Sequence, residues 1–300
     1  PRRLRALWAL HVTLGLADEL ASELLESPEP YLRGWTVQLL CEEGDPSSKL
    51  REAFVKLAES DPSPIVRRFL ASAAQRLSPL ARWPILERLA ARAEDADDHN
   101  LPLLYWYALE PLVPADTARA QKLAETTPID PLRQFIIRRQ AEATSASDKS
   151  GPQRSGLAAL LNTLADTRSA SLQLEILDSI AAATEGQTNL EPPREWRDAY
   201  AKLSASPDPE IIAKADALAA RFGSRDVFAA KRRVLTDPFA PLPARQAALK
   251  IVLEDRNFQQ APMYYRLLTE PGLRRDALRG LSHYDVASTP PALFELYHTF

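Results

Sequence analysis

The side chains that could do chemistry in this chain are few and lie far apart in the sequence. The histidines are His11, His99, His283 and His298, and the single cysteine is Cys41. No histidine belongs to an HExxH pattern or lies near a cysteine or a second histidine at the spacing of a zinc site. Nucleophile-elbow, phosphate-loop and CxxCH patterns do not occur either. The sequence therefore predicts no catalytic, cofactor-binding or metal-binding residue, and we expect His11 and Cys41 to pack on apolar helical faces.

A second candidate for chemistry is the acidic stretch EDADDHN at residues 94–100. Asp95 and Asp97 alternate as in a loop that binds Ca²⁺, but His99 interrupts the pattern and no glycine follows it. Alternatively, these carboxylates cap the helix that we expect to begin near Leu101, because negative charge stabilises a helix N-terminus. We favour capping, and contact with an ion or a partner stays open.

Three aromatic residues, Tyr105, Trp106 and Tyr107, follow on the next predicted helix. Successive residues of a helix differ in direction by about 100°, so these side chains cannot all face inward. At least one is therefore exposed or packed between repeats. One interpretation is a platform on which a ligand stacks. Interlocking of adjacent repeats is the interpretation that we favour.

Four arginines each follow a helix-starting proline by two or three residues. They are Arg33, Arg67, Arg133 and Arg274. At this spacing they point the same way from successive units, and they form either a ladder with acidic residues of neighbouring units or a basic strip on a concave face. We favour the ladder because the net charge is −3 and arginine–carboxylate pairs suit contacts between repeats. The residues predicted to contribute to an interaction surface are Arg33, Arg67, Asp95, Asp97, Asp98, Trp106 and Arg133.

The element that must position these side chains is a helix that recurs along the chain. In residues 61–77, DPSPIVRRFLASAAQRL, Ser63 can cap a helix and Pro64 suits its first position. One apolar stripe follows with helical spacing, and we expect Arg67 and Arg68 at the solvent end of this helix. Similar proline-led segments begin at residues 27, 206, 240 and 270. The chain is therefore predicted to be a repeat protein.

The repeats pair one helix with the next. The expected pairs are 17–26 with 30–42, 47–59 with 64–77, 80–93 with 101–112, 116–126 with 131–143, 157–166 with 169–184, 193–204 with 209–222, 226–235 with 243–254, and 258–269 with 273–283. Residues 2–13 resemble a second helix without its first, and residues 291–300 begin another pair, so we expect the array to continue beyond both ends. Corresponding prolines, such as Pro30 and Pro64, are 34 residues apart. The predicted fold is an all-α solenoid of about eight HEAT-like pairs.

The predicted organisation is an N-terminal set of repeats at residues 1–143, a loop or linker at 144–156 and a C-terminal set at 157–300. The stretch 144–156, TSASDKSGPQRSG, has the composition of a linker, and we favour a surface loop over a joint. The net charge gives no general reason to bind nucleic acid. No run of about 18 apolar residues suggests a membrane span.

Three stretches resemble a known family. They are RALWALHVT at residues 5–13, PYLRGWTVQLLCEEG at 30–44 and the long segment RWPILERLAARAEDADDHNLPLLYWYALEPLVPAD at 82–116. They look like the HEAT-repeat section of large PVC-type bacterial proteins described as membrane-bound dehydrogenases with a haem-binding domain. In that family a propeller similar to sugar dehydrogenases precedes the repeats, and a c-type cytochrome domain with a CxxCH motif follows them. The resemblance implies an exported, periplasmic parent protein that carries haem c outside this chain, and it assigns no functional residue here.

The function expected from these observations is that of a non-catalytic scaffold. The array would hold flanking domains of the same polypeptide, or present its concave face to a protein partner. One alternative is a helical-repeat enzyme similar to a DNA glycosylase, which would need a basic groove and a catalytic acid. Another is a free-standing adaptor that binds peptides.

Overall fold

The computed structural model describes residues 2–142, 152–187, 190–255, 258–285, 287 and 289–297. Throughout these residues the chain is helical, with eighteen α-helices and no strand, and neighbouring helices pack in pairs as in a helical-repeat solenoid. The predicted all-α class and solenoid architecture are confirmed. The chain divides into two compact units, Pro1–Leu160 and Leu161–Phe300.

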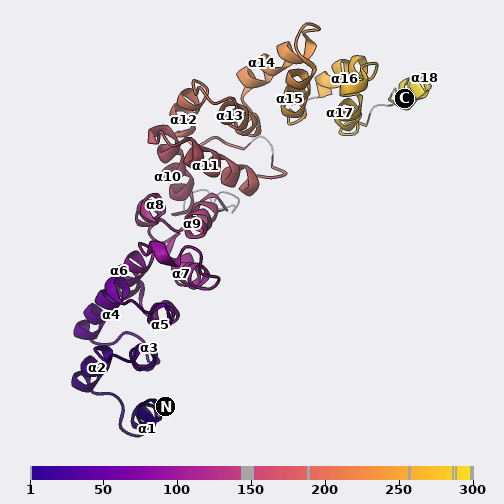
Figure 1. The fold of residues 1–300 in the computed structure, drawn as a ribbon. Helices are drawn as coiled ribbons and strands as arrows, with labels where there is room; N and C mark the ends of the chain where they lie inside the picture. Colours follow the sequence, from indigo (N-terminus) through magenta and orange to yellow (C-terminus); the bar gives the residue numbers. More distant parts are fainter. Residues whose placement is uncertain are drawn as a thin grey trace. The chain divides into compact units, whose positions relative to one another are not determined.

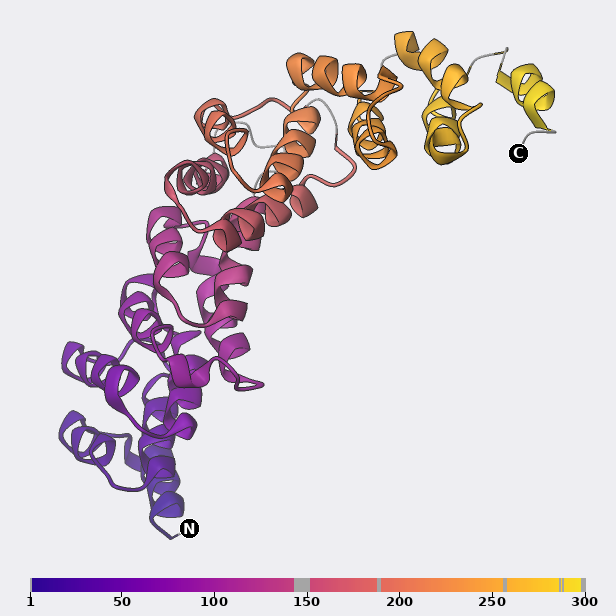
Figure 2. The ribbon, with the colours of Figure 1, turned by 45° about the horizontal axis from the view of Figure 1, so that its top comes forward.

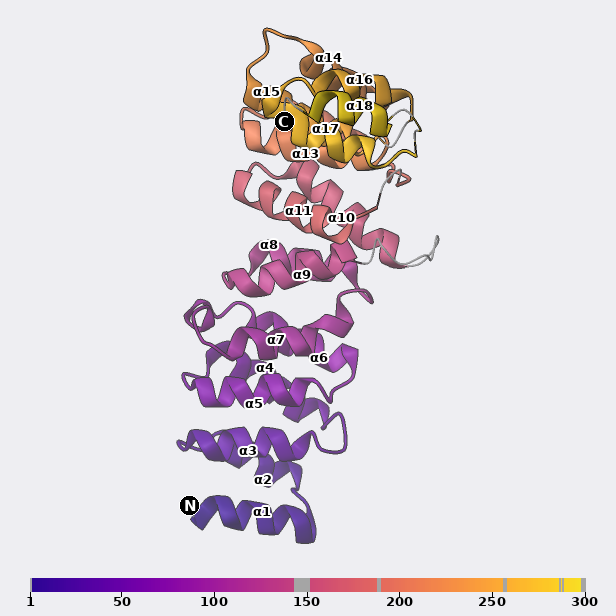
Figure 3. The same ribbon diagram turned by 90° about the vertical axis from the view of Figure 1, so that its right-hand side faces the viewer.

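The first unit is built from two rows of helices. Its helices are α1 (Arg2–Leu14), α2 (Asp18–Leu25), α3 (Pro30–Leu40), α4 (Ser48–Ser60), α5 (Pro64–Ala74), α6 (Pro79–Leu89), α7 (Leu101–Leu109), α8 (Thr117–Thr126) and α9 (Asp130–Glu142). The boundary between the units falls within α10 (Pro152–Asp166). The second helices of the pairs, α3, α5, α7 and α9, contact one another in order, and α1 contacts α3 (Figure 1). The first helices α2, α4 and α6 form the other row. Figure 3 shows the second helices lying side by side.

The second unit continues the same pairing. Its helices are α11 (Ala170–Ala183), α12 (Trp196–Leu203), α13 (Pro209–Arg221), α14 (Arg225–Thr236), α15 (Leu242–Val252), α16 (Ala261–Leu267), α17 (Pro271–Leu281) and α18 (Thr289–Leu296). The helices α11, α13, α15 and α17 contact one another in sequence, and α12, α14 and α16 each pack on the helix that follows (Figure 2). Buried apolar residues of α14 to α17, including Leu249 and Tyr264, form one core cluster.

The residues at the start of several helices explain why each helix begins there. Pro30, Pro64 and Pro271 occupy the first turn of α3, α5 and α17, where a missing N–H costs no helical hydrogen bond. The prediction that the Ser63 side chain caps α5 is wrong, because it makes no capping bond. Instead the backbone N–H of Ser63 donates to Asp61 Oδ1 at 2.9 Å. The carboxylate therefore fixes the turn that leads into the helix.

Several predicted bounds differ from the structure. The helix predicted at 80–93 ends at Leu89, and a 3₁₀ turn, Ala93–Asp95, occupies the start of the acidic stretch. The helix predicted at 101–112 is α7 followed by a second 3₁₀ turn, Glu110–Leu112, because Pro111 cannot donate the helical bond. In the predicted linker, residues 152–156 are the start of α10, whereas residues 144–151 lie outside the described residues.

Candidate functional site

A ladder of buried arginines joins successive repeats of the first unit. Arg33 of α3 holds the Asp61 carboxylate with two bonds, from Nε at 2.7 Å and from Nη2 at 2.8 Å. Its remaining nitrogen, Nη1, donates to the Ser27 carbonyl at 2.7 Å. Arg67 of α5 repeats this arrangement one unit later, with bonds of 2.7 and 2.5 Å to Asp95 and one of 3.0 Å to the Asp61 carbonyl. Asp61 therefore connects the two arginines.

The ladder ends on a tyrosine of the next second helix. The Tyr105 hydroxyl of α7 donates to Asp95 Oδ2 at 2.6 Å. Burial and the neighbouring Asp95 charge raise the pKa of Tyr105 well above its usual value, so the hydroxyl remains a donor. Arg67 and Asp95 are 3% and 1% exposed. One hydrogen-bonded chain thus runs from the turn before α3 to α7.

The burial of the arginine ladder contradicts part of the predicted interaction surface. Arg33, Arg67 and Asp95 are enclosed by the packing of the repeats, so they cannot present a surface to a partner. The expectation that Arg67 sits at the solvent end of its helix is likewise wrong, whereas its neighbour Arg68 is exposed. The apolar stripe of α5 does not reveal this burial. Arg67 follows Val66 at the edge of the stripe, and its guanidinium is buried only because it pairs with Asp95.

Arg33 and Arg67 are the fourth residues of their helices, and an arginine occupies the same position in other second helices of both units, with different partners. The fourth residue of α9 is Arg133, which donates to the Thr127 carbonyl and pairs with Asp130 of its own helix. The fourth residue of α17, Arg274, donates to the Leu268 carbonyl at 2.7 Å. The fourth residue of α15, Arg245, holds both oxygens of Glu270 at 2.6 and 2.9 Å. Sequence reasoning missed Arg245, although it stands three residues after the start of its helix as Arg33 does.

The acidic stretch serves mainly to begin α7. Asp98 Oδ1 accepts the backbone N–H groups of Asn100 at 2.8 Å and of Leu101, the first residue of α7, at 2.9 Å. An acidic residue therefore satisfies one free N–H at the start of α7, as predicted, although the N-cap residue Asn100 makes no side-chain capping bond. These two bonds lower the pKa of Asp98. Asp97 is exposed, while Asp95 turns inward to the ladder. No cluster of potential metal ligands occurs among the residues that the structure describes.

Aromatic side chains line up across the second helices. The sixth residues of α3, α5, α7 and α9 are Trp35, Phe69, Trp106 and Phe135. Ring centroids are 5.6 Å apart for Trp35 and Phe69, and 5.5 Å apart for Trp106 and Phe135. Trp106 therefore packs between repeats, as predicted, while the adjacent Tyr107 is 53% exposed. Each ring helps to fix the distance between neighbouring second helices.

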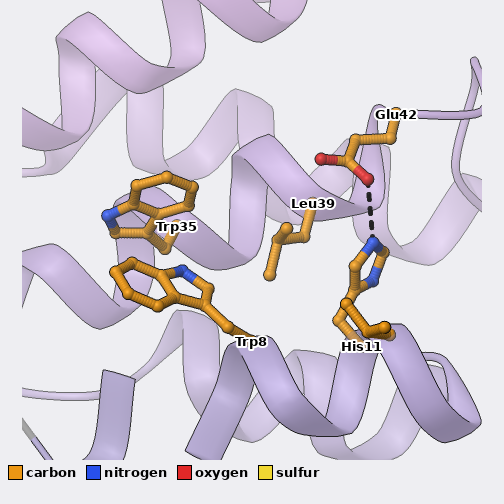
Figure 4. A pocket seen from close by; sticks show the side chains of 6 residues that line it. Trp8, His11, Trp35, Leu39 and Glu42 are labelled. Atoms are coloured by element: carbon orange, nitrogen blue, oxygen red, sulfur yellow. Dashed lines mark hydrogen bonds and ion pairs between the residues drawn. The ribbon is translucent and has the colours of Figure 1, made fainter. Parts of the chain in front are cut away.

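The row of aromatic rings ends in an open hollow between α1 and α3. Trp8 of α1 packs edge-on against Trp35, with centroids 4.9 Å apart and an angle of 73° between the rings. Val12, Leu39 and the hydrogen-bonded pair of His11 and Glu42 complete the lining (Figure 4). The His11 Nε2 and Glu42 Oε2 atoms are 2.9 Å apart, and the volume of the hollow is about 320 Å³. It combines an aromatic end with an acidic end.

The sequence did not identify this hollow as a site. His11 was expected to be a partly buried core residue, and it is partly buried, but its ring reaches Glu42 rather than an apolar neighbour. No local pattern of the sequence marks the hollow, because it depends on α1 lying beside α3. Cys41 lies close in sequence but is fully buried, and burial raises the pKa of its thiol to about 12.

Comparison with known proteins adds no relative of assigned function: no protein-family model matches this chain, and no curated protein does. Among the described helices, none combines the length and the apolar character that crossing a membrane requires.

Proposed function

We propose that this chain is a non-catalytic, HEAT-like scaffold that holds protein modules at a fixed separation. The observation that carries the proposal is the buried hydrogen-bonded chain from Ser27 through Arg33, Asp61, Arg67 and Asp95 to Tyr105. A repeat array relies on contacts between neighbours for its stability. Directional bonds between repeats add a fixed register to apolar packing, which by itself tolerates small shifts.

The energetics of these pairs favour a structural role. A buried ion pair stabilises a folded protein little more than an apolar pair of similar volume would, but removing one partner of the ion pair costs about 3–5 kcal/mol. An arginine fork on a carboxylate also restricts geometry more than a point charge does. The ladder therefore penalises any sliding or opening between α3, α5 and α7. Such rigidity suits a segment that spaces other domains.

The resemblance to PVC-type dehydrogenase proteins supports a particular setting for this scaffold. In that setting the chain belongs to a larger, exported redox protein, between a sugar-dehydrogenase-like propeller and a c-type cytochrome domain. The reading frame that contains the chain tests this directly. A propeller encoded before residue 1 and a CxxCH motif after residue 300 are the expected result. A frame that encodes neither would remove the redox setting and leave a free-standing adaptor.

The scaffold proposal itself is tested by the spread of one distance. Glu23 of α2 and Lys122 of α8 are both exposed and can be replaced by cysteine for spin labelling, because buried Cys41 does not compete for the label. Double electron–electron resonance should give one narrow distance distribution in the otherwise unchanged chain. A broad or multimodal distribution would show that the first unit does not hold a fixed separation. Haem binding or sugar oxidation by the isolated chain would also refute a non-catalytic role.

A further inference from the structure

The two rows of helices in the first unit differ in charge. The second helices α3, α5 and α7 contain no aspartate or glutamate within their bounds, whereas each of the first helices α2, α4 and α6 contains at least one. Of the three arginines on these second helices, Arg33 and Arg67 are buried in the ladder. The third, Arg68 of α5, is exposed, so it gives the open side of this row a positive charge.

The charge of Arg68 is not neutralised within the part of the chain that the structure describes. No carboxylate there forms an ion pair with Arg68, and its guanidinium lies 5.8 Å from the ring centroid of Phe69 instead. By contrast, the exposed Arg138 on α9 of the same row pairs with Glu142 of its own helix. A guanidinium over an aromatic ring keeps its N–H groups available to a carboxylate. Arg68 is therefore a cation that can accept an anionic partner.

Apolar side chains are exposed on the second helix that packs against α5. Tyr107 is the seventh residue of α7 and is 53% exposed, and Leu103, one turn earlier, is 39% exposed. On α5 the half-buried Phe69 is the sixth residue, and α5 and α7 lie side by side (Figure 3). Both neighbours of this pair in the row, α3 and α9, are in place, so the stacking of repeats does not cover this surface. Exposed apolar and aromatic side chains that gather in this way mark sites of protein contact.

We propose that the surface formed by Arg68, Phe69, Leu103 and Tyr107 docks an acidic segment of a protein partner that carries an apolar side chain next to a carboxylate. The carboxylate pairs with the Arg68 guanidinium, and the apolar side chain packs on the exposed rings. Because α3, α5 and α7 carry no carboxylate, an acidic segment is favoured on this surface and a basic segment is disfavoured. The inference rests on the proposed scaffold function and names the chemistry of one protein that the scaffold holds.

The test uses the full chain and three blocked peptides of glycine and serine that differ only in a central motif. The motifs are Glu-Leu-Glu, Gln-Leu-Gln and Glu-Ser-Glu. Isothermal titration calorimetry at low salt should show saturable binding of the Glu-Leu-Glu peptide, about two- to fivefold tighter than binding of either other peptide and weaker as salt is added. Equal affinity for any two of the three peptides that include Glu-Leu-Glu, or no saturable binding of it, would overturn the proposal. So would a short oligothymidylate that binds more tightly than this peptide and loses its affinity in Arg68→Gln, because the surface would then take nucleic acid.

Variants of the chain separate this surface from the others. Arg68→Gln should abolish the preference for glutamate over glutamine, and Tyr107→Ser should abolish the preference for leucine over serine; both side chains are exposed, so the fold is retained. Lys56→Gln is the matched control, since Lys56 is an exposed cation of α4 on the row of first helices. A Lys56→Gln variant that loses the preference for glutamate as completely as Arg68→Gln would refute the assignment. The distance distribution between α2 and α8 reports on the scaffold separately, so the two proposals can fail independently.

Discussion

Replacing Arg67 by methionine tests the ladder most informatively. The substitution leaves the Asp95 carboxylate, which is 1% exposed, with the Tyr105 hydroxyl but without its cation, and it removes a donor from the Asp61 carbonyl. Breaking a buried pair from one side costs about 3–5 kcal/mol. We therefore expect the free energy of unfolding, measured with urea by circular dichroism, to fall by about that amount.

The neighbouring residue supplies the matched control. Arg68 is exposed, and its guanidinium lies 5.8 Å from the Phe69 ring centroid. Arg68→Met removes the same chemical group from the next position of α5 and should change stability by no more than about 0.5 kcal/mol. Comparable effects of Arg67→Met and Arg68→Met would refute the reasoning, because they would mean that the buried pair has no special role.

A compensating variant extends the same test. Replacing Arg67 with methionine, Asp95 with leucine and Tyr105 with phenylalanine removes every charged or hydroxyl group of that rung. Apolar replacement of a complete buried pair is often neutral or stabilising. The triple variant should therefore regain most of the stability lost in Arg67→Met. If it unfolds as easily as the single variant, the loss comes from packing volume and not from an unpaired buried charge.

Three further outcomes follow from individual contacts. Gly34→Ala should destabilise the first unit by about 1–3 kcal/mol in urea unfolding, because the new Cβ overlaps the Phe69 ring. Adding Phe69→Leu should recover part of the lost stability. A Gly34→Ala variant as stable as the original chain would contradict the close packing of α3 and α5. The hydrogen bonds that Asp98 accepts at the start of α7 lower its pKa in the folded state. The stability that this carboxylate contributes is therefore present above its unfolded pKa of about 3.9 and is lost as pH falls through the lower folded value. Asp98→Asn should flatten the dependence of unfolding free energy on pH in that acidic range, and an unchanged dependence would contradict this role. Cys41 should react with a thiol reagent at pH 8 only after unfolding, since burial raises its pKa to about 12, and rapid reaction of the folded chain would show that α3 opens.

The sequence predicted the class and the pairing of the helices because both depend on local patterns. Proline-led starts and apolar stripes of helical spacing recur often enough to mark most helices between Ala17 and His283. It also predicted that Arg33 and Arg67 form a ladder, because their place after a helix-starting proline repeats. Their partners Asp61 and Asp95 follow 28 residues later in both cases. The sequence reasoning named no partner for either arginine, although this recurring interval could have identified Asp61 and Asp95.

Burial of single side chains was harder to predict, because it depends on the neighbouring repeat. Arg67 and Arg68 are adjacent and identical in type, yet one is enclosed and the other is exposed. Asp95, Asp97 and Asp98 likewise share one loop and take three different environments. The hollow at Trp8 and Trp35 needed the alignment of α1 beside α3, which no local pattern of either helix specifies.

Native-state hydrogen exchange of Arg67→Met tests the central claim, that buried bonds couple successive repeats. Arg67 lies on α5, but its bonds lead to the turn before α5 and to the loop that precedes α7. The account predicts faster exchange of amides in α3 and α7 as well as in α5, with Arg68→Met unchanged. Faster exchange confined to α5 would contradict coupling between the repeats.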